Sequence, residues 1–132
     1  MGLFRRKVVR YEIEARPDME VWGEGYYQRT LKTLAELLAD YRLINGMYEP
    51  HGPHPDIPVM IELRRNPDNL DDVKCMIDGL MVGHLNPEAA ARLQDDLHEA
   101  EEKGLKAEVK GRMSGGVPPE GTWSVKIGWR SR

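Results

Sequence analysis

Apolar and polar residues alternate along several short segments of this chain, which is the pattern of half-buried β-strands. Two longer segments instead repeat apolar residues every three or four positions, which is the pattern of an amphipathic helix. The alternation predicts strands over residues 4–14, 20–25, 59–63, 73–77, 80–85, 105–113 and 122–129. The helical period predicts helices over residues 26–42 and 87–103. This order of elements predicts an α+β fold with a mostly antiparallel sheet.

Each predicted helix carries a single buried stripe. In the first helix the stripe consists of Tyr27, Leu31, Leu34, Leu38 and Tyr41. In the second it consists of Ala89, Leu93, Leu97 and Ala100. Asn86 followed by Pro87 is a typical helix start, so Asn86 is expected to cap the second helix, and Gly104 is expected to end it.

Residues 61–85 form the centre of this pattern, because three apolar runs alternate there with two turn signals. Residues 66–72 are rich in Asn and Asp, which hydrogen-bond their own backbone in turns. Asp78-Gly79 is a hairpin signal. Residues 47–58 and 114–121 are rich in Pro and Gly and predict loops. We therefore expect one globular unit over residues 20–132, preceded by a strand or extension over residues 1–19.

The composition argues against a protein that coats nucleic acid by charge alone, because the 132 residues carry a net charge of -3 and the pI is about 5.8. Basic residues gather near both ends of the chain, which leaves room for one basic face. Cys75 is the single cysteine, so no internal disulfide framework is expected. No apolar run has the length of a membrane helix or a signal peptide, and the sequence predicts a soluble, cytoplasmic protein.

Several residues that could carry chemistry lack the partners that the chemistry needs. His51 and His54 are too few for a zinc site. The acids Asp68, Asp71 and Asp72 do not follow the spacing of a calcium loop, and the local pattern favours turn formation. A thiolate at Cys75 with His84 as its base is disfavoured by the apolar strand around the cysteine. We expect no enzyme, no metal and no cofactor.

The aromatic residues leave two interpretations open. Tyr26 and Tyr27 are adjacent and cannot both face the core, so Tyr26 is expected at the surface. An exposed Tyr near Arg29 and Lys32 suits base stacking, but covering a sheet edge is an equally good interpretation. Trp123 shares a strand face with apolar neighbours, so core packing is favoured over a ligand platform.

Taken in order, several motifs resemble the HIRAN domain, a small module of some DNA translocases that also occurs alone in bacterial and phage proteins. The motifs are VWGEGYYQ at residues 21–28, RRNPDNLDD at residues 64–72 and VGHL at residues 82–85, followed by a helix and a last strand with Trp123. Together they cover roughly residues 20–130. The resemblance implies an OB-like, six-stranded barrel or bent sheet with two flanking helices.

The resemblance also implies binding of single-stranded DNA at a free 3′ end. By position, Tyr26 and Tyr27 match aromatics that contact the terminal nucleotides, and Asp72 matches an acid that recognises the 3′-hydroxyl. His84 and Trp123 match residues that line the pocket. Arg64 or Arg65 is expected to contact phosphate. The implied role is a DNA repair or replication accessory.

The chain departs from the family pattern at several positions around this pocket. Gly25 stands where Arg often precedes the two tyrosines, and Asp71 replaces a Tyr before the key acid. Lys74-Cys75 replaces Asn-Ala, and Asn86-Pro87 follows VGHL in place of a basic residue. These departures favour an alternative, a protein-interaction module of the same fold, with a partner in a DNA-processing complex, that has lost the DNA pocket.

Overall fold

The computed structural model describes residues 10–44, 56–115 and 122–128. The strands are β1 (Arg10–Ile13), β2 (Val21–Trp22), β3 (Asp56–Asn66), β4 (Asn69–Ile77), β5 (Leu80–Leu85), β6 (Lys106–Gly115) and β7 (Trp123–Ile127). The helices are η2 (Glu24–Tyr27, a 3-10 turn), α1 (Gln28–Ile44), α2 (Pro87–Arg92) and α3 (Gln94–Glu102). His51 and His54 lie outside the described residues, as does most of the expected loop over residues 47–58.

The predicted α+β class with a mostly antiparallel sheet is confirmed. The strands follow the order β1-β6-β3-β4-β5-β2, and β7 also pairs with β6. One edge of β6 pairs with β3, and the other edge is shared between β1 at its beginning and β7 at its end. The β1–β6 pair is parallel and the other pairs are antiparallel. Among the described residues the sheet has seven strands, not the six that the family resemblance implies, and it is open.

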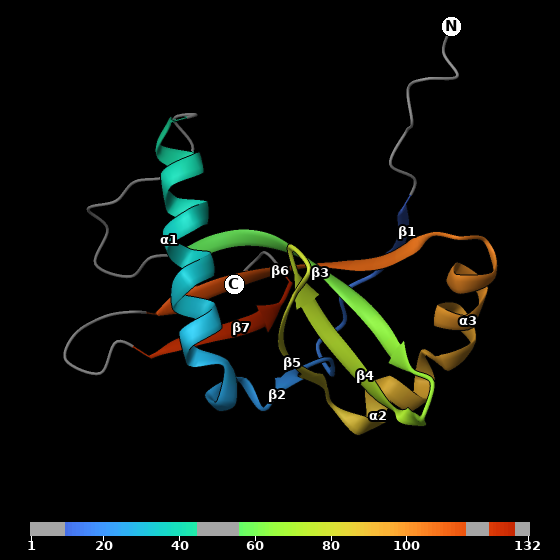
Figure 1. Ribbon diagram of the computed structural model, residues 1–132. Helices are drawn as coiled ribbons and strands as arrows, with labels where there is room; N and C mark the ends of the chain where they lie inside the picture. Colours follow the sequence, from blue (N-terminus) through green and yellow to red (C-terminus); the bar gives the residue numbers. More distant parts are fainter. Residues whose placement is uncertain (1–9, 45–55, 116–121, 129–132) are drawn as a thin grey trace, which may run out of the picture.

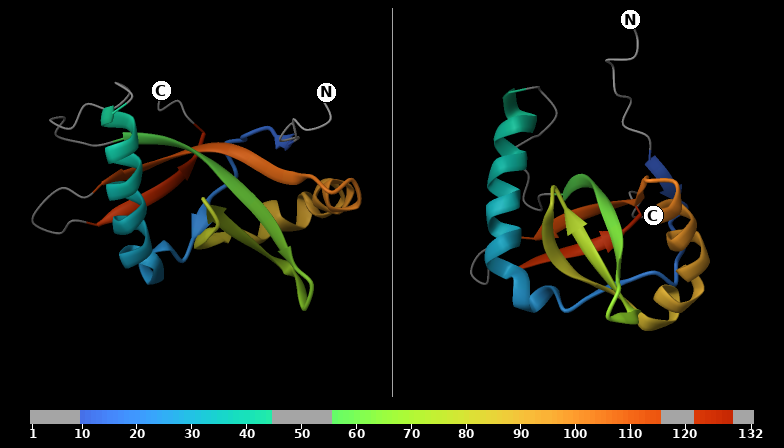
Figure 2. Two further views of the ribbon diagram at one scale, coloured as in Figure 1. Left: turned by 45° about the horizontal axis from the view of Figure 1, so that its top comes forward. Right: turned by 45° about the vertical axis from the view of Figure 1, so that its right-hand side comes forward.

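The long strands β3 and β6 cross the molecule as a twisted ribbon, with α1 at one end and α2 and α3 at the other (Figures 1 and 2). Alternate residues of the strands point into the core between these helices, including Ile61, Val73 and Val109, which have no exposed surface. Of the strand expected over residues 4–14, residues 4–9 lie outside the described ranges, and β1 at Arg10–Ile13 belongs to the same sheet as the other strands.

Both predicted helix stripes face this core. Leu31 and Leu34 are buried and Leu38 is half-buried, whereas the side chain of Tyr41 lies outside the described set. In the second helical segment the four stripe residues are all buried: Ala89, Leu93, Leu97 and Ala100. The single helix expected there is divided into α2 and α3 at Leu93. None of the helices in the described ranges is long and apolar enough to cross a lipid bilayer.

Asn86 does not cap α2 with its side chain, which corrects the prediction. Its side chain is buried, with 4% of its surface exposed, and ties down the preceding chain. The side-chain Nδ2 donates to the Asp18 carbonyl at 3.0 Å, and Oδ1 accepts from the Glu20 amide at 2.8 Å. These long-range partners satisfy a buried amide better than a local cap does, and they fix the entry into β2.

The predicted turn over residues 66–72 is much shorter in the structure. The side chain of Asn66 accepts from the amide of Asp68, and that of Asn69 accepts from the amide of Asp71, so the Asx bonds do form. The strands nevertheless resume at once, with β4 beginning at Asn69. Asp72 therefore lies on a strand and not in the turn. A strand position fixes the direction of its side chain more firmly than a turn does.

The opening between β2 and β7 is bridged by side chains from η2 and α1. The Gln28 amide donates to the Trp123 carbonyl at 2.8 Å and accepts from the Trp123 N–H at 2.7 Å. Glu24 accepts from the Val125 N–H at 2.6 Å. A glutamine that uses both ends of its amide replaces the bonds of a neighbouring strand, so this part of the β7 edge does not lie open.

Candidate functional site

Asp72, His84 and Asn66 form a hydrogen-bonded cluster on the outer face of the sheet. His84 Nδ1 lies 2.6 Å from Asp72 Oδ1, and Asn66 Nδ2 donates to Asp72 Oδ2 at 3.1 Å. Partial burial acts to raise the pKa of Asp72, but the hydrogen bonds from Asn66 and His84 outweigh it and lower the pKa below its ordinary value. The cluster therefore holds an ionised carboxylate with a fixed orientation.

Strand pairing brings these residues together from distant parts of the sequence. His84 on β5 lies opposite Lys74 on β4, and Asp72 is two residues from Lys74 on the same face. Gly83 allows β2 to approach, because a Cβ at this position would lie 2.7 Å from the Trp22 carbonyl oxygen. The glycine of the VGHL motif thus has a packing role, and the histidine after it faces outward.

Tyr27 reaches the cluster through a tight turn after β2. Gly23 has a φ of 81°, a left-handed conformation that glycine adopts without strain, and it directs the chain into η2. The Tyr27 ring then lies 6.5 Å from the His84 ring, and its hydroxyl contacts Met81 Sδ at 3.7 Å. Tyr26 next to it is 91% exposed, which agrees with the expectation that it lies at the surface.

Trp22 is an aromatic residue of this site that sequence reasoning missed. It lies opposite His84 in the β2–β5 pair and is 52% exposed. Its indole N–H donates to Glu20 Oε1 at 2.9 Å, which holds the ring. Val21 is buried and Trp22 is exposed, so the alternation of side chains along a strand is the sequence signal that indicates an outward Trp22.

The remaining predicted residues do not join this cluster. Arg64 is on the outer face and pairs with Glu62, with nitrogen–oxygen distances of 3.1–3.2 Å. Arg65 points to the opposite face, where it makes a bidentate bond to Glu101 at 2.7 and 3.0 Å. Trp123 is half-buried and packs against the core.

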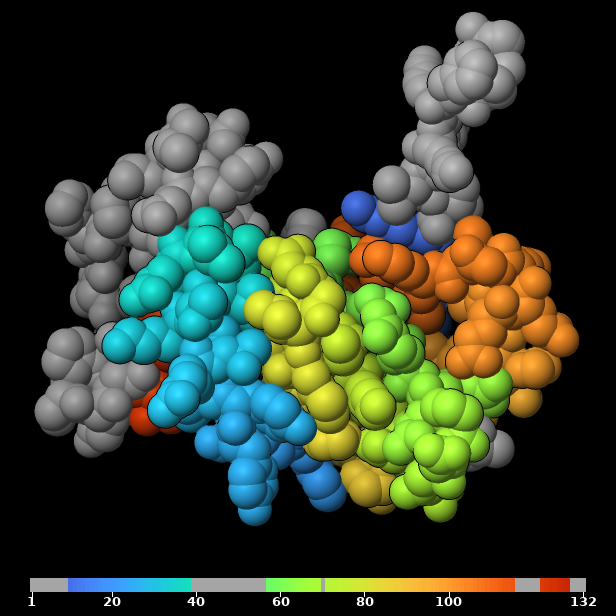
Figure 3. All heavy atoms as spheres, viewed as in Figure 1, coloured from blue at the N-terminus to red at the C-terminus, as the bar shows by residue number. Residues whose placement is uncertain are grey.

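In Figure 3 the segment of η2 and α1, coloured blue to cyan, lies directly against the yellow strands of the β4–β5 hairpin.

The thiol of Cys75 lies on the core side of the sheet, away from the cluster. Cys75 is buried, and burial raises the pKa of its thiol to about 12. It pairs with Gly83 and therefore faces away from His84. No group of three potential metal ligands occurs in the ranges 10–44, 56–115 and 122–128.

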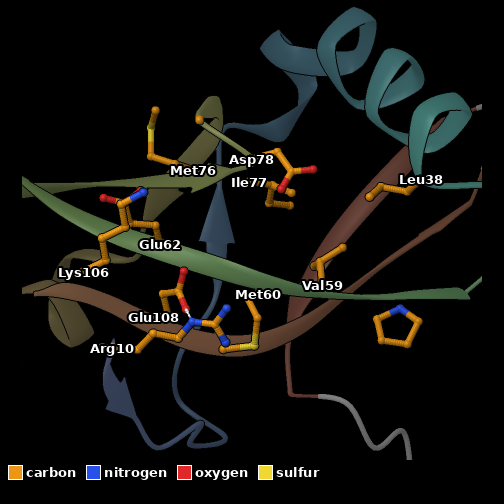
Figure 4. A pocket seen from close by; sticks show the side chains of 12 residues that line it. Arg10, Leu38, Val59, Met60, Glu62, Met76, Ile77, Asp78, Lys106 and Glu108 are labelled. Carbon is orange, nitrogen blue, oxygen red and sulfur yellow. Dashed lines mark ion pairs between the residues drawn. The ribbon is translucent and has the colours of Figure 1, made fainter. Parts of the chain in front are cut away.

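A cavity of about 740 Å³ lies elsewhere, over β3 and β6 (Figure 4). Its lining mixes the carboxylates of Glu62 and Glu108 with Arg10 and the apolar side chains of Met60 and Met76. Arg10 Nε lies 3.0 Å from Glu108 Oε1, so the charges of the cavity are partly balanced from within. The cavity does not include the tyrosines, Asp72 or His84.

Comparison of the chain with protein-family models, curated proteins and solved structures finds no match.

Proposed function

We propose that the protein binds single-stranded DNA near a free 3′ end and does so without catalysis. The observation that carries the proposal is the convergence of an ionised, oriented carboxylate with three aromatic side chains. His84, which is bonded to Asp72, lies beside the Tyr27 ring, and Trp22 and Tyr26 are exposed on the segment that leads to Tyr27. The ordered resemblance to the HIRAN domain adds support, because it assigns Tyr26, Tyr27, Asp72 and His84 to one pocket.

In this proposal the aromatic residues supply affinity and the carboxylate supplies selectivity. Base stacking on an aromatic ring contributes about 1–3 kcal/mol per base and does not depend on the base. Tyr26 and Trp22 are exposed enough to stack on bases, and Tyr27 forms the side of the site next to His84. A carboxylate has about four lone-pair positions, so Asp72 can accept a hydroxyl bond in addition to the bonds from His84 and Asn66. It repels a terminal phosphate.

We also infer that the sheet is an opened relative of an OB-like barrel. The support is the bridge of Glu24 and Gln28 across the opening between β2 and β7. In an OB-fold barrel, nucleic acid is bound on strands of the outer face and on adjoining loops. The outer position of Asp72 and His84 on the central strands fits that arrangement.

Fluorescence anisotropy with labelled oligonucleotides tests the proposal. Single strands ending in a 3′-hydroxyl, single strands ending in a 3′-phosphate, and duplexes are compared at low salt. We expect the hydroxyl-ended single strand to bind best. Negligible binding to all three, by a protein whose fold is verified by circular dichroism, would overturn the proposal.

Two substitutions separate stacking from end recognition. Tyr26→Ala is expected to weaken binding to every single strand by about 5- to 150-fold, which corresponds to the loss of one stacked base. Asp72→Ala is expected to remove the preference for the hydroxyl end. Leu37→Ala is the matched control for Tyr26, because Leu37 is an exposed apolar residue on the adjoining helix, with 60% of its surface exposed. A preference for the hydroxyl end that survives Asp72→Ala would place recognition elsewhere.

A second candidate function is binding of a protein partner through the same surface. It is favoured by one observation, the exposure of Trp22 and Tyr26, since Trp and Tyr are enriched at the energetic centres of protein interfaces. If the protein binds a protein partner and not DNA, neither the wild type nor Tyr26→Ala binds any strand in the DNA titrations.

A further inference from the structure

Four side chains form a row across the outer face of the sheet. Trp22 on β2 lies opposite His84 on β5, His84 lies opposite Lys74 on β4, and Lys74 lies opposite Arg64 on β3. Opposed residues of antiparallel strands project to the same face, so the row runs at right angles to the strands. With a strand spacing of about 4.8 Å, it spans roughly 14 Å.

The burial of the flanking residues confirms which face the row occupies. Leu63, Val73 and Cys75 are neighbours of the row in the sequence, and all three are buried on the core side. Arg64 and Trp22 are exposed, whereas Lys74 and His84 are half-buried. The row is therefore a strip of surface with Trp22 at one end, His84 beside it, and the cations Lys74 and Arg64 along the rest.

Within this row, Lys74 is the residue whose charge is least satisfied. Arg64 is paired with Glu62, and His84 is paired with Asp72. The Lys74 ammonium makes no hydrogen bond or ion pair with any residue that the structure describes, and it acts on Asp72 only through charge. A half-buried ammonium without a direct partner favours an anionic ligand at this position.

Asp72 and Lys74 together present a pair of opposite charges to one nucleotide. They are two residues apart on β4 and point to the same face, with backbone positions about 7 Å apart. A nucleotide at a 3′ end carries a hydroxyl on one side of its sugar and a phosphate on the other. The carboxylate suits the hydroxyl and repels phosphate, whereas the ammonium suits the phosphate.

We propose that Lys74 binds the phosphate of the terminal nucleotide and that the strand leaves the site along the row, toward Arg64 on β3. This inference rests on the proposed function and adds the path and polarity of the bound strand. Arg64 then contacts a phosphate further from the 3′ end and gives up its ion pair with Glu62 to do so. The side chain of Arg64 is 51% exposed and can turn to a phosphate, whereas that of Glu62 is only 15% exposed, so the phosphate contact has to offset the loss of this carboxylate's partner.

The salt dependence of binding tests the role of Lys74. Each phosphate contact to a single strand contributes about 0.7 to the slope of log K against log salt. Lys74→Gln is therefore expected to lower the slope by about 0.7, so that its affinity deficit shrinks about 2.6-fold between 50 and 200 mM salt. The titrations use the full chain and a ten-nucleotide strand with a 3′-hydroxyl.

Lys106→Gln is the matched control, because Lys106 is also a lysine of this sheet but lies outside the row, exposed on β6 and paired with Arg10 of β1. Its slope is expected to equal that of the wild type. Arg64→Gln tests the path, since it is expected to weaken the ten-nucleotide strand and leave a dinucleotide with a 3′-hydroxyl unaffected. Unfolding midpoints equal to that of the wild type verify that the variants are folded.

The outcomes distinguish this inference from the proposed function. A wild-type protein that binds no strand overturns both. A wild type that binds, together with an unchanged slope in Lys74→Gln or an equal loss in Lys106→Gln, overturns the inference alone. Equal weakening of the dinucleotide and the longer strand by Arg64→Gln refutes the direction of the path.

Discussion

Removal of the Gln28 side chain is expected to destabilise the protein markedly, although Gln28 lies outside the hydrophobic core. The two bonds of its amide with the Trp123 backbone, at 2.7 and 2.8 Å, connect α1 to β7. Each such bond contributes about 0.5–1.5 kcal/mol net, and the backbone groups left behind are partly shielded from water. We expect Gln28→Ala to lower the free energy of unfolding by about 2 kcal/mol.

Urea denaturation followed by circular dichroism measures this change. With an m-value of about 2 kcal/mol per molar, the midpoint is expected to fall by about 1 M. Lys32→Ala is the control, because Lys32 is exposed on the same helix and alanine is a good helix former. A Gln28→Ala midpoint that differs from that of Lys32→Ala by less than 0.25 M, or about 0.5 kcal/mol, would refute the bridging role.

Gln28→Glu refines the test, because it keeps the acceptor and replaces the donor. At neutral pH the carboxylate faces the Trp123 carbonyl and repels it, so we expect at least the loss seen with alanine. Below pH of about 4 the acid is protonated and donates again, so the deficit relative to the wild type is expected to shrink. A deficit independent of pH would show that the carbonyl bond contributes little.

Three further outcomes follow from the same region. Burial raises the pKa of Glu24, although a backbone N–H donates to its carboxylate, so the ionised form of Glu24 opposes folding. Glu24→Gln is therefore expected to raise the urea midpoint at pH 7. This gain should disappear below pH of about 4.5, where the carboxyl group is protonated in both the folded and the unfolded state. The pKa of Asp72 is lower in the folded protein than in the unfolded chain, where it is about 3.9. The ionised carboxylate therefore stabilises the fold above that pH, and the stabilisation is lost as the pH falls through the pKa of the folded state. Asp72→Asn is expected to flatten the decrease in stability at acid pH, and an unchanged decrease would contradict this. Gly83→Ala is expected to lower the thermal midpoint by several degrees, because the added Cβ meets the Trp22 carbonyl, and Trp22 fluorescence should report the shift of β2.

The sequence predicted the fold where one physical requirement dominates. The stripe of small and apolar residues in α2 and α3 is buried as expected, because the helical period and the core demand the same residues. Asn86 shows the limit of local reasoning. Its position before a proline favours a cap, but its side chain bonds to Asp18 and Glu20, partners that no local pattern reveals.

The candidate site was less predictable because it depends on strand register. The turn signal at residues 66–72 placed Asp72 in a loop, whereas the strand pairing with β5 decides that it meets His84. Trp22 became part of the site only through its position opposite His84. Arg64 and Arg65 are adjacent in the sequence, yet the pleat sends them to opposite faces, and Glu101 occupies the second of them.

The shared edge of β6 has a consequence for the order in which the protein can fold. Arg10 of β1 pairs with Lys106 of β6, so β1 has no strand partner in this sheet until β6 has been made. At about 5–20 residues per second, β1 remains unpaired on the ribosome for roughly 5–20 s. During that time β2, β3, β4 and β5 can assemble, and the sheet extends to β1 and β7 only in the last step. Translation speed and early chaperone contact are therefore expected to affect the yield of native protein more than the stability of the finished fold.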